Sequence, residues 1–156
     1  MEVLYKMSLV KNFFIILIAV LFFQINISIA EEIIFRTDSG LVKTEEFLKS
    51  GNYTAALQTS SNVLMKHPRN ADAYVYRGYA YYKLGQTQKA FESFKTALMI
   101  NPSHLGANKY LGNIFIDKGK INRAIEQLQA LRIVCGSYNC AEIDILEAEI
   151  NKASNK

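Results

Sequence analysis

The sequence has few of the residues on which most catalytic and metal-binding sites depend. Its 156 residues include two cysteines, two prolines, two histidines and no tryptophan. His67 directly precedes Pro68, and His104 closely follows Pro102, so both histidines occupy turn positions where a polar side chain serves a structural role. The sequence also lacks a glycine-rich phosphate loop, a nucleophile elbow and a paired-carboxylate motif. We therefore expect no enzymatic activity, no cofactor, no metal and no small-molecule substrate.

A strong excess of charge of either sign is also absent. The formal net charge is +4, and the basic residues are scattered along the chain, which favours a solvated surface over a nucleic-acid-binding one. Half of the residues are hydrophobic, well above the level of a disordered chain. The composition predicts one small folded domain.

The strongly apolar run near the N-terminus is shorter than a typical membrane span. The strongly apolar part of the N-terminus covers residues 13–23, whereas a helical span needs ~20 residues. Two lysines precede this run, and the small residues Ser28 and Ala30 follow it. This order predicts a signal peptide over residues 1–30 and an exported chain that is periplasmic or secreted. The alternative is an uncleaved inner-membrane anchor formed by residues 13–29, which would be the only membrane contact.

Glycine is sparse, but its positions repeat. Gly51, Gly85 and Gly119 are evenly spaced along the chain. The same spacing relates three alanines, two prolines and two further glycines: Ala56, Ala90 and Ala124; Pro68 and Pro102; Gly78 and Gly112. Gly51, Gly85 and Gly119 can each end a helix in the left-handed conformation.

The small residues between these turns predict where two helices cross. A side chain larger than a methyl group would hold closely crossing backbones apart. We therefore expect Gly78 and Ala90 to set the crossing and Tyr81 and Phe94 to fill the space that remains. Most of the aromatic residues are accordingly predicted to belong to the core.

The repeat period of about 34 residues, together with these residue types, resembles that of tetratricopeptide repeats, in which each unit is a helix, a turn and a second helix. Residues 71–102 carry the likeness most fully, through Tyr74 in the place usual for tryptophan and through Gly78, Tyr81, Ala90, Phe94, Ala97 and Pro102. The resemblance implies an all-α solenoid over residues 31–152, with repeats at about 37–68, 71–102 and 105–136. The first repeat is degenerate, because Lys43 and Thr44 replace the usual Leu-Gly pair.

The C-terminal segment is predicted to cap the last repeat. Asn139, with Glu142 shortly after it, indicates the start of a helix over residues 140–152, and residues 153–156 are predicted to be a tail. Cys135 and Cys140 favour a disulfide in an exported protein; redox-active thiols or a zinc site shared with a histidine are the alternatives. This segment also resembles small exported bacterial tetratricopeptide proteins that carry a cysteine pair.

The family resemblance implies a groove lined by the first helix of each repeat, which binds a peptide or a helix of another protein. Matched by position, the groove residues are Leu41, Glu45 and Leu48; Val75, Tyr79 and Tyr82; Lys109, Asn113 and Ile116. Tyr79, Tyr82, Lys109 and Asn113 are the candidate binding residues. Lys109 and Asn113 resemble half of a carboxylate clamp, but repeat one carries Leu41 and Glu45 at the corresponding places.

The resemblance therefore favours a non-catalytic adaptor of the bacterial periplasm or cell envelope that binds another protein or a peptide. The alternative is a thiol redox or chaperone accessory protein that uses Cys135 and Cys140. A third possibility is a repeat module of a larger complex with no ligand of its own.

Overall fold

The computed structural model describes residues 16–20, 24, 39–138 and 140–155. The chain divides into two units, residues 1–38 and 39–156, and residues 16–20 of the first are helical. The expected cleavage after Ala30 lies outside the described residues. Among the residues that are described, none of the helices has both the length and the apolar character required to cross a membrane.

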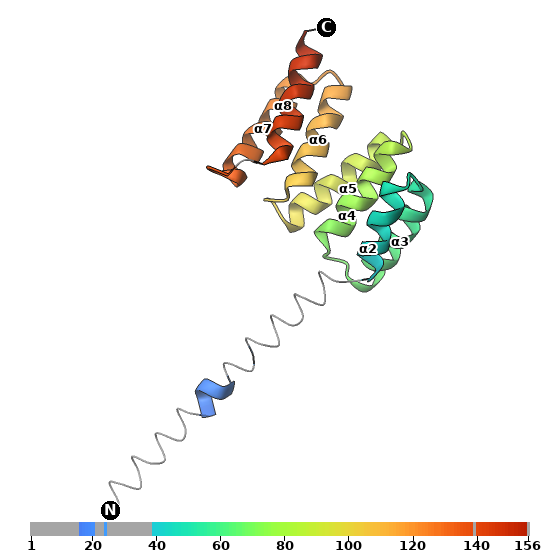
Figure 1. The fold of residues 1–156 in the computed structure, drawn as a ribbon, viewed down its shortest axis with the longest axis vertical. Helices are drawn as coiled ribbons and strands as arrows, with labels where there is room; N and C mark the ends of the chain where they lie inside the picture. Colours follow the sequence, from blue (N-terminus) through green and yellow to red (C-terminus); the bar gives the residue numbers. More distant parts are fainter. Residues whose placement is uncertain (1–15, 21–23, 25–38, 139, 156) are drawn as a thin grey trace, which may run out of the picture. The chain divides into compact units, whose positions relative to one another are not determined.

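The second unit is built from α-helices in antiparallel pairs (Figure 1). The helices are α2 (Ser39–Lys49), α3 (Tyr53–Lys66), α4 (Ala71–Lys83), α5 (Thr87–Ile100), α6 (Leu105–Asp117), α7 (Ile121–Cys135) and α8 (Ala141–Ser154). The pairs α2–α3, α4–α5 and α6–α7 each fall within one of the three ranges expected for a repeat, and α8 packs on α6 and α7. The predicted all-α class is confirmed, and the described residues contain no strand.

Each pair turns at a glycine, as the sequence predicts. Gly51, Gly85 and Gly119 have φ values of 76°, 73° and 66°, in the left-handed region that disfavours any other side chain. At the third turn the backbone N–H of Lys120 donates to the carbonyl of Phe115 at 2.8 Å. This bond closes the end of the helix in a Schellman motif.

The crossing of α4 and α5 confirms the predicted role of small residues. A Cβ atom at Gly78 would lie 2.7 Å from Cε1 of Phe94, closer than packed atoms approach. Ala90 and Phe94 are fully buried in this crossing. Tyr81 is only half-buried and packs at the edge of the core, so Phe94 alone fills the centre.

Repeat one departs from the pattern by exchanging small and large residues. Thr44 holds the place in repeat one that Gly78 holds in repeat two, and Ser60 holds the place of Phe94. Both are fully buried, and the Thr44 hydroxyl donates to the carbonyl of Gly40 at 2.7 Å while the Ser60 hydroxyl donates to that of Ala56 at 2.7 Å. A larger residue on the first helix is thus matched by a smaller one on the second, which keeps the filled volume similar.

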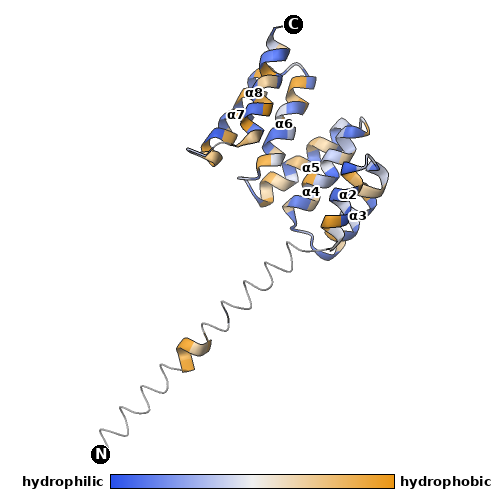
Figure 2. Ribbon diagram, in the orientation of Figure 1, coloured by the Kyte–Doolittle hydropathy of each residue, from blue (hydrophilic) through white to orange (hydrophobic). Residues whose placement is uncertain are grey.

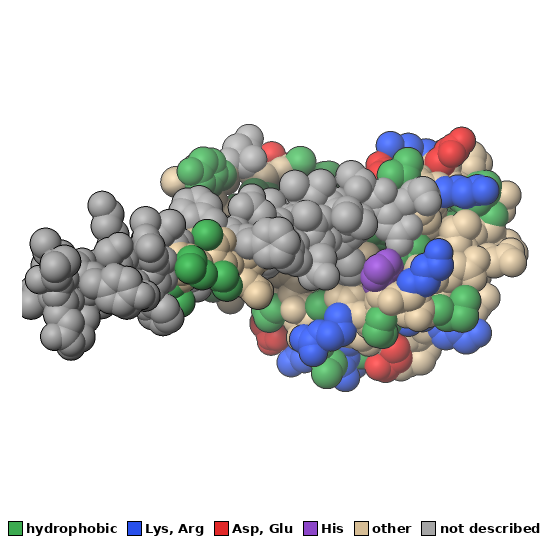
Figure 3. Space-filling model, turned by 90° about the horizontal axis from the view of Figure 1, so that it is seen from below, with side chains coloured by type: hydrophobic (Ala, Val, Ile, Leu, Met, Phe, Trp, Pro, Cys, Tyr) green, Lys and Arg blue, Asp and Glu red, His purple; other side chains and the backbone are tan. Residues whose placement is uncertain are grey.

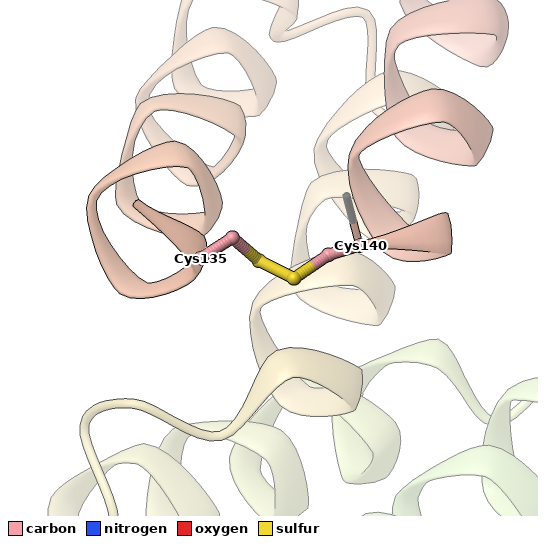
Figure 4. Close-up of a disulfide and its surroundings, with 2 residues drawn as sticks. All are labelled: Cys135 and Cys140. Atoms are coloured by element: carbon pink, nitrogen blue, oxygen red, sulfur yellow. A yellow bond between two sulfur atoms is a disulfide. The ribbon is translucent and has the colours of Figure 1, made fainter. Parts of the chain in front are cut away.

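Helix α8 closes the end of the unit and is tied to α7 by a disulfide between Cys135 and Cys140 (Figure 4). Cys140 occupies the N-cap position and makes no side-chain capping bond. The helix begins at Ala141 and continues to Ser154 instead of ending at residue 152. The expected start signal at Asn139 lies outside the described residues.

Hydrophobic and hydrophilic residues alternate around the helices, as Figure 2 shows. The apolar side of most helices lies in one core, whose largest fully buried side chains are Phe94, Ile114, Leu131 and Leu146. A smaller core under α2 contains Leu41, Val63, Leu64 and Ala73. The paired helices therefore leave the outer sides of α2, α4 and α6 free to form a surface.

Candidate functional site

A groove runs along the first helix of each pair and contains two depressions. The larger depression has a volume of about 600 Å³ and is lined by α2, α4, α6, the α5–α6 turn and the first turn of α8. The smaller one has a volume of about 190 Å³ and is lined by the C-terminal parts of α4, α6 and α8. We call these the large depression and the small depression, and both together the groove.

Tyrosine rings form one wall of the large depression. The ring of Tyr79 lies 4.9 Å from that of Tyr110 and 6.4 Å from that of Tyr53, measured between centroids. Tyr110 in turn stacks on the buried Phe94 at 5.4 Å. Because the wall is built on the core, it is fixed before any ligand arrives.

The hydroxyls of Tyr76 and Tyr110 in the large depression remain protonated at neutral pH. Burial raises the pKa of Tyr76 to about 12, and the carboxylate of Glu45, whose Oε2 lies 3.4 Å from the Tyr76 hydroxyl, acts in the same direction. Burial also raises the pKa of Tyr110. These hydroxyls are therefore hydrogen-bond donors at the wall of the large depression.

The charged groups of the large depression are partly matched within the chain. Lys49 Nζ lies 2.7 Å from Glu45 Oε1, and this bond is the main reason that the pKa of Glu45 is lowered. Lys109 Nζ lies 4.3 Å from the centroid of the Tyr110 ring, which holds the ammonium by a cation–π contact. Glu142, from the first turn of α8, adds a third carboxylate to those of Glu45 and Asp72.

His104 has the surroundings of a structural residue. As the N-cap of α6, its Nδ1 accepts the backbone N–H of Ala107 at 3.3 Å, and its Nε2 donates to Asp72 Oδ1 at 2.9 Å. Both ring nitrogens are thus engaged, so the imidazole has no free nitrogen with which to take a proton from a nearby serine such as Ser103. This geometry agrees with the predicted structural role of the histidine.

The small depression combines carboxylates with a tyrosine hydroxyl and an amide. The Tyr82 hydroxyl donates to Asp117 Oδ2 at 2.6 Å, and burial followed by this bond raises its pKa. Glu149 lines the same depression, and burial raises the pKa of its carboxyl. Asn113 also lines it, and its Oδ1 is enclosed without a hydrogen-bond partner in the described part of the chain.

The four candidate binding residues line the groove, but they do not meet at one point. Tyr79 and Lys109 lie in the large depression, whereas Tyr82 and Asn113 lie in the small one. Of the other predicted groove residues, Leu41 does not line either depression: it is 6% exposed and packs in the smaller core. The rest line one depression or the other: Glu45, Leu48 and Val75 the large one, and Ile116 the small one.

Sequence reasoning missed several groove residues for different reasons. Tyr76 and Tyr110 are one repeat period apart and both line the large depression, so the period itself could have identified them. The acidic residues Glu142 and Glu149 come from α8. These two residues were not predicted, because the capping helix was expected only to cover the core. The repeat pattern does not predict which residues of this helix face the groove.

The disulfide has a structural setting. Cys135 is 4% exposed at the end of α7, and the bond joins it to the residue that precedes α8 (Figure 4). Redox-active cysteines need an accessible sulfur. The buried position of Cys135 therefore favours a structural disulfide, which holds the capping helix in place, and disfavours a redox-active cysteine pair. While the disulfide is intact, neither sulfur can bind zinc.

Comparisons with known proteins agree on the repeat fold. Residues 71–104 match the family model described as tetratricopeptide repeat. A comparison with curated protein sequences gives no significant match.

Three solved structures illustrate the likeness. A tetratricopeptide repeat protein from Parabacteroides merdae is 22% identical with a TM-score of 0.62, over 74% of this chain and 44% of that one. The TPR2B domain of yeast Sti1, in a complex with pHsp70, is 20% identical with a TM-score of 0.68, over 74% and 94%. The second TPR domain of human RPAP3, bound to the HSP70 peptide SGPTIEEVD, is 20% identical with a TM-score of 0.64, over 76% and 94%. The chain thus spans less than half of the bacterial protein, and at these identities the likeness establishes the fold.

Proposed function

We propose that this chain, of which residues 71–104 match the tetratricopeptide repeat model, is a non-catalytic adaptor that binds a segment of another protein in its groove. The observation that carries this proposal is the groove itself: two depressions on one face, walled by tyrosines and containing a hydrogen-bonding group that the described residues do not satisfy. Similar domains from yeast Sti1 and human RPAP3 are solved with pHsp70 and with an HSP70 peptide. Those complexes support a peptide or protein segment as the kind of ligand.

The tyrosine wall suits this work because of its rigidity. Tyrosine presents a large surface with few rotatable bonds and a polar tip, so it loses little conformational entropy when a ligand binds. The rings of Tyr79 and Tyr110 are already packed on one another, and Tyr110 is packed on Phe94. A ligand therefore meets a wall that is already ordered.

One face of the molecule gives no support to a nucleic-acid ligand. On the face shown in Figure 3, basic and acidic side chains are interspersed rather than gathered in a patch of one sign. Phosphate backbones are bound by clusters of Lys and Arg. A protein partner is therefore the better match to this surface.

Substitutions in the groove should weaken partner binding. The partner can be identified by crosslinking a tagged full-length chain in intact cells, and its affinity then measured with purified proteins. We expect Tyr82→Ala to weaken binding by ~1 to 3 kcal/mol, as for an aromatic anchor, and Lys109→Ala to weaken it because an ammonium that can reach a carbonyl is lost. Circular dichroism should show that the helices are retained.

Lys89→Ala is the matched control for Lys109→Ala. Lys89 Nζ lies 5.4 Å from the Tyr81 ring, in a cation–π contact like that of Lys109, but on the α4–α5 side outside the groove. Binding by Lys89→Ala should equal that of the wild type. If Tyr82→Ala and Lys109→Ala also bind as well as the wild type, the groove is not the working surface.

We further infer that the adaptor works in the bacterial periplasm or cell envelope. The order of charged, apolar and small residues in residues 1–30 supports export. The disulfide between Cys135 and Cys140 supports it as well, since such bonds persist in oxidising compartments.

Export predicts a defined N-terminus for the mature protein. N-terminal sequencing of protein purified from cells should begin at Glu31. A chain that begins at Met1 or Glu2 would contradict cleavage and support the anchor formed by residues 13–29.

A further inference from the structure

We propose that the segment bound in the groove is basic, and that it places a lysine or arginine side chain in the small depression against Asp117 and Glu149. This inference rests on the proposed function and specifies the chemistry of its partner. The source is a segment of another protein rather than a free small molecule.

The charge of the groove is opposite to that of the chain. The large depression is lined by three carboxylates and two lysines, and the small depression by two carboxylates and one lysine. The whole chain, in contrast, carries a net charge of +4. The groove therefore attracts a cationic segment, and the remaining, net positive surface repels it. An acidic segment is repelled by the groove and attracted by the remaining surface.

The carboxylates of the small depression have spare capacity for a cation. Asp117 accepts one hydrogen bond from the neutral Tyr82 hydroxyl, which orients the carboxylate without neutralising it. In the part of the chain that the structure describes, neither Asp117 nor Glu149 takes part in a salt bridge. Burial is the main cause that raises the pKa of Glu149 and so penalises its charged form; Asp117 adds to this penalty, while Lys109 and Lys152 reduce it without removing it. A bound cation would reduce the penalty further.

Asn113 gives an independent indication that a ligand supplies a hydrogen-bond donor in the small depression. Its Oδ1 is enclosed at the wall of the small depression and has no hydrogen-bond partner among the residues that the structure describes, which is a costly state for a buried acceptor. Because the amide lines the depression, a rotation about its last side-chain bond can present the oxygen to a bound donor. Lysine and arginine offer three and five donors respectively, so one cationic side chain can serve Asn113 together with the two carboxylates.

The remaining walls suit the aliphatic stem of such a side chain. Ile116 and Ala153 line the small depression beside the polar groups. Lysine and arginine bury their methylene groups against apolar surface while the charged end reaches polar partners. The volume of about 190 Å³ has room for one side chain and not for a helix. The small depression thus has a place for each part of a cationic side chain.

Repeat one disfavours the opposite ligand. Glu45 stands where a carboxylate clamp would need a polar or cationic group, and its carboxylate is held at the large depression by Lys49 and Tyr76. An acidic segment would lie against this carboxylate and that of Glu142. Like charges across an interface oppose binding, so we expect acidic peptides to be rejected.

A library of random peptides displayed on phage tests the inference with the full domain as bait. We expect the selected peptides to be enriched in lysine and arginine and to bind less tightly as salt is added. Binding of a selected peptide should fall by about tenfold or more in the double variant Asp117→Asn, Glu149→Gln, which removes two charges and keeps the acceptor that Tyr82 uses.

The matched control carries the same two substitutions outside the groove. Glu126→Gln with Asp144→Asn alters exposed carboxylates of α7 and α8 and changes the net charge equally. It should bind a selected peptide as the wild type does. If the two double variants lose peptide binding equally, the loss is due to the change in net charge alone. That result would overturn the assignment to the small depression.

The outcomes separate this inference from the function on which it rests. Acidic or neutral peptides that lose binding with Tyr82→Ala or Lys109→Ala would overturn the basic partner and leave the groove as a binding site. The peptide SGPTIEEVD serves as an acidic probe of this case. A library that yields no peptide sensitive to any groove variant would contradict both proposals.

Discussion

Replacing Phe94 with alanine is expected to lower the free energy of unfolding by about 3 to 5 kcal/mol, the cost typical of deleting a buried aromatic ring. Phe94 is fully buried, lies against Gly78 and stacks on Tyr110. Its removal opens a cavity at the crossing of α4 and α5 and takes away the support of the groove wall. Chemical denaturation followed by circular dichroism measures the loss.

The contact with Gly78 makes the prediction more specific. The effect of Gly78→Ala on the free energy of unfolding should be destabilising in the wild type and stabilising in the Phe94→Ala background. In the wild type, Gly78→Ala places a methyl group against the Phe94 ring, and overpacking of about 1 to 3 kcal/mol outweighs the gain in helix propensity. In the Phe94→Ala background the methyl group enters the space left by the ring. There, Gly78→Ala should stabilise the fold by up to about 1 kcal/mol, and the double-mutant cycle measures the coupling.

Phe47→Ala is the control for the loss of a ring. Phe47 lies on α2 and is only partly buried, so its replacement should cost clearly less than that of Phe94. If Gly78→Ala has the same effect in both backgrounds, the two residues are not in contact and the crossing lies elsewhere.

Replacing Leu146 with alanine is expected to cost about 2 to 5 kcal/mol, because it removes the main anchor of the cap. Leu146 is fully buried, and a Cβ atom at Gly112 would lie 2.7 Å from its Cδ1. The side chain thus occupies the space that Gly112 leaves open on α6. Denaturation monitored as above measures the cost, with the disulfide kept oxidised so that α8 remains tethered.

The neighbouring residue provides the comparison. Ile145 is 43% exposed on the same helix, and Ile145→Ala removes a side chain of similar size from a position that packs little. Its effect should stay within about 1 kcal/mol. Equal costs for Ile145→Ala and Leu146→Ala would show that α8 does not dock through the face described here.

The repeat fold was predictable because its determinants are local and periodic. Gly85 and Gly119 are required by the φ values at which the helices turn, and Gly78 is required by the ring of Phe94. The turn glycine recurs at the same place in all three repeats, and the glycine at the place of Gly78 recurs in the third as Gly112, whereas repeat one has Thr44 there. The period therefore revealed both the helix pairs and their crossings.

The groove was predictable only in part, because it depends on contacts between repeats. The side to which Tyr79 points followed from its position in the helix, but its packing on Tyr110 and the bond from Tyr82 to Asp117 join residues of different repeats. Leu41 was wrongly placed in the groove. The degenerate first repeat has no earlier repeat in front of it among the described residues, and Leu41 packs in the core below α2 instead.

The order of the helix contacts has a consequence for how the domain forms. Each helix packs on its immediate neighbours in the chain, and the first helices of adjacent pairs also touch, as α2 does α4 and α4 does α6. Among the described helices, the first pair makes no extensive packing with α8. During synthesis, which proceeds from the N-terminus, each helix hairpin can therefore fold as soon as its second helix has left the ribosome, before the C-terminal part of the chain is made. Only the last hairpin, α6–α7, depends on a later element, the capping helix α8. The disulfide between Cys135 and Cys140 keeps α8 close to α7.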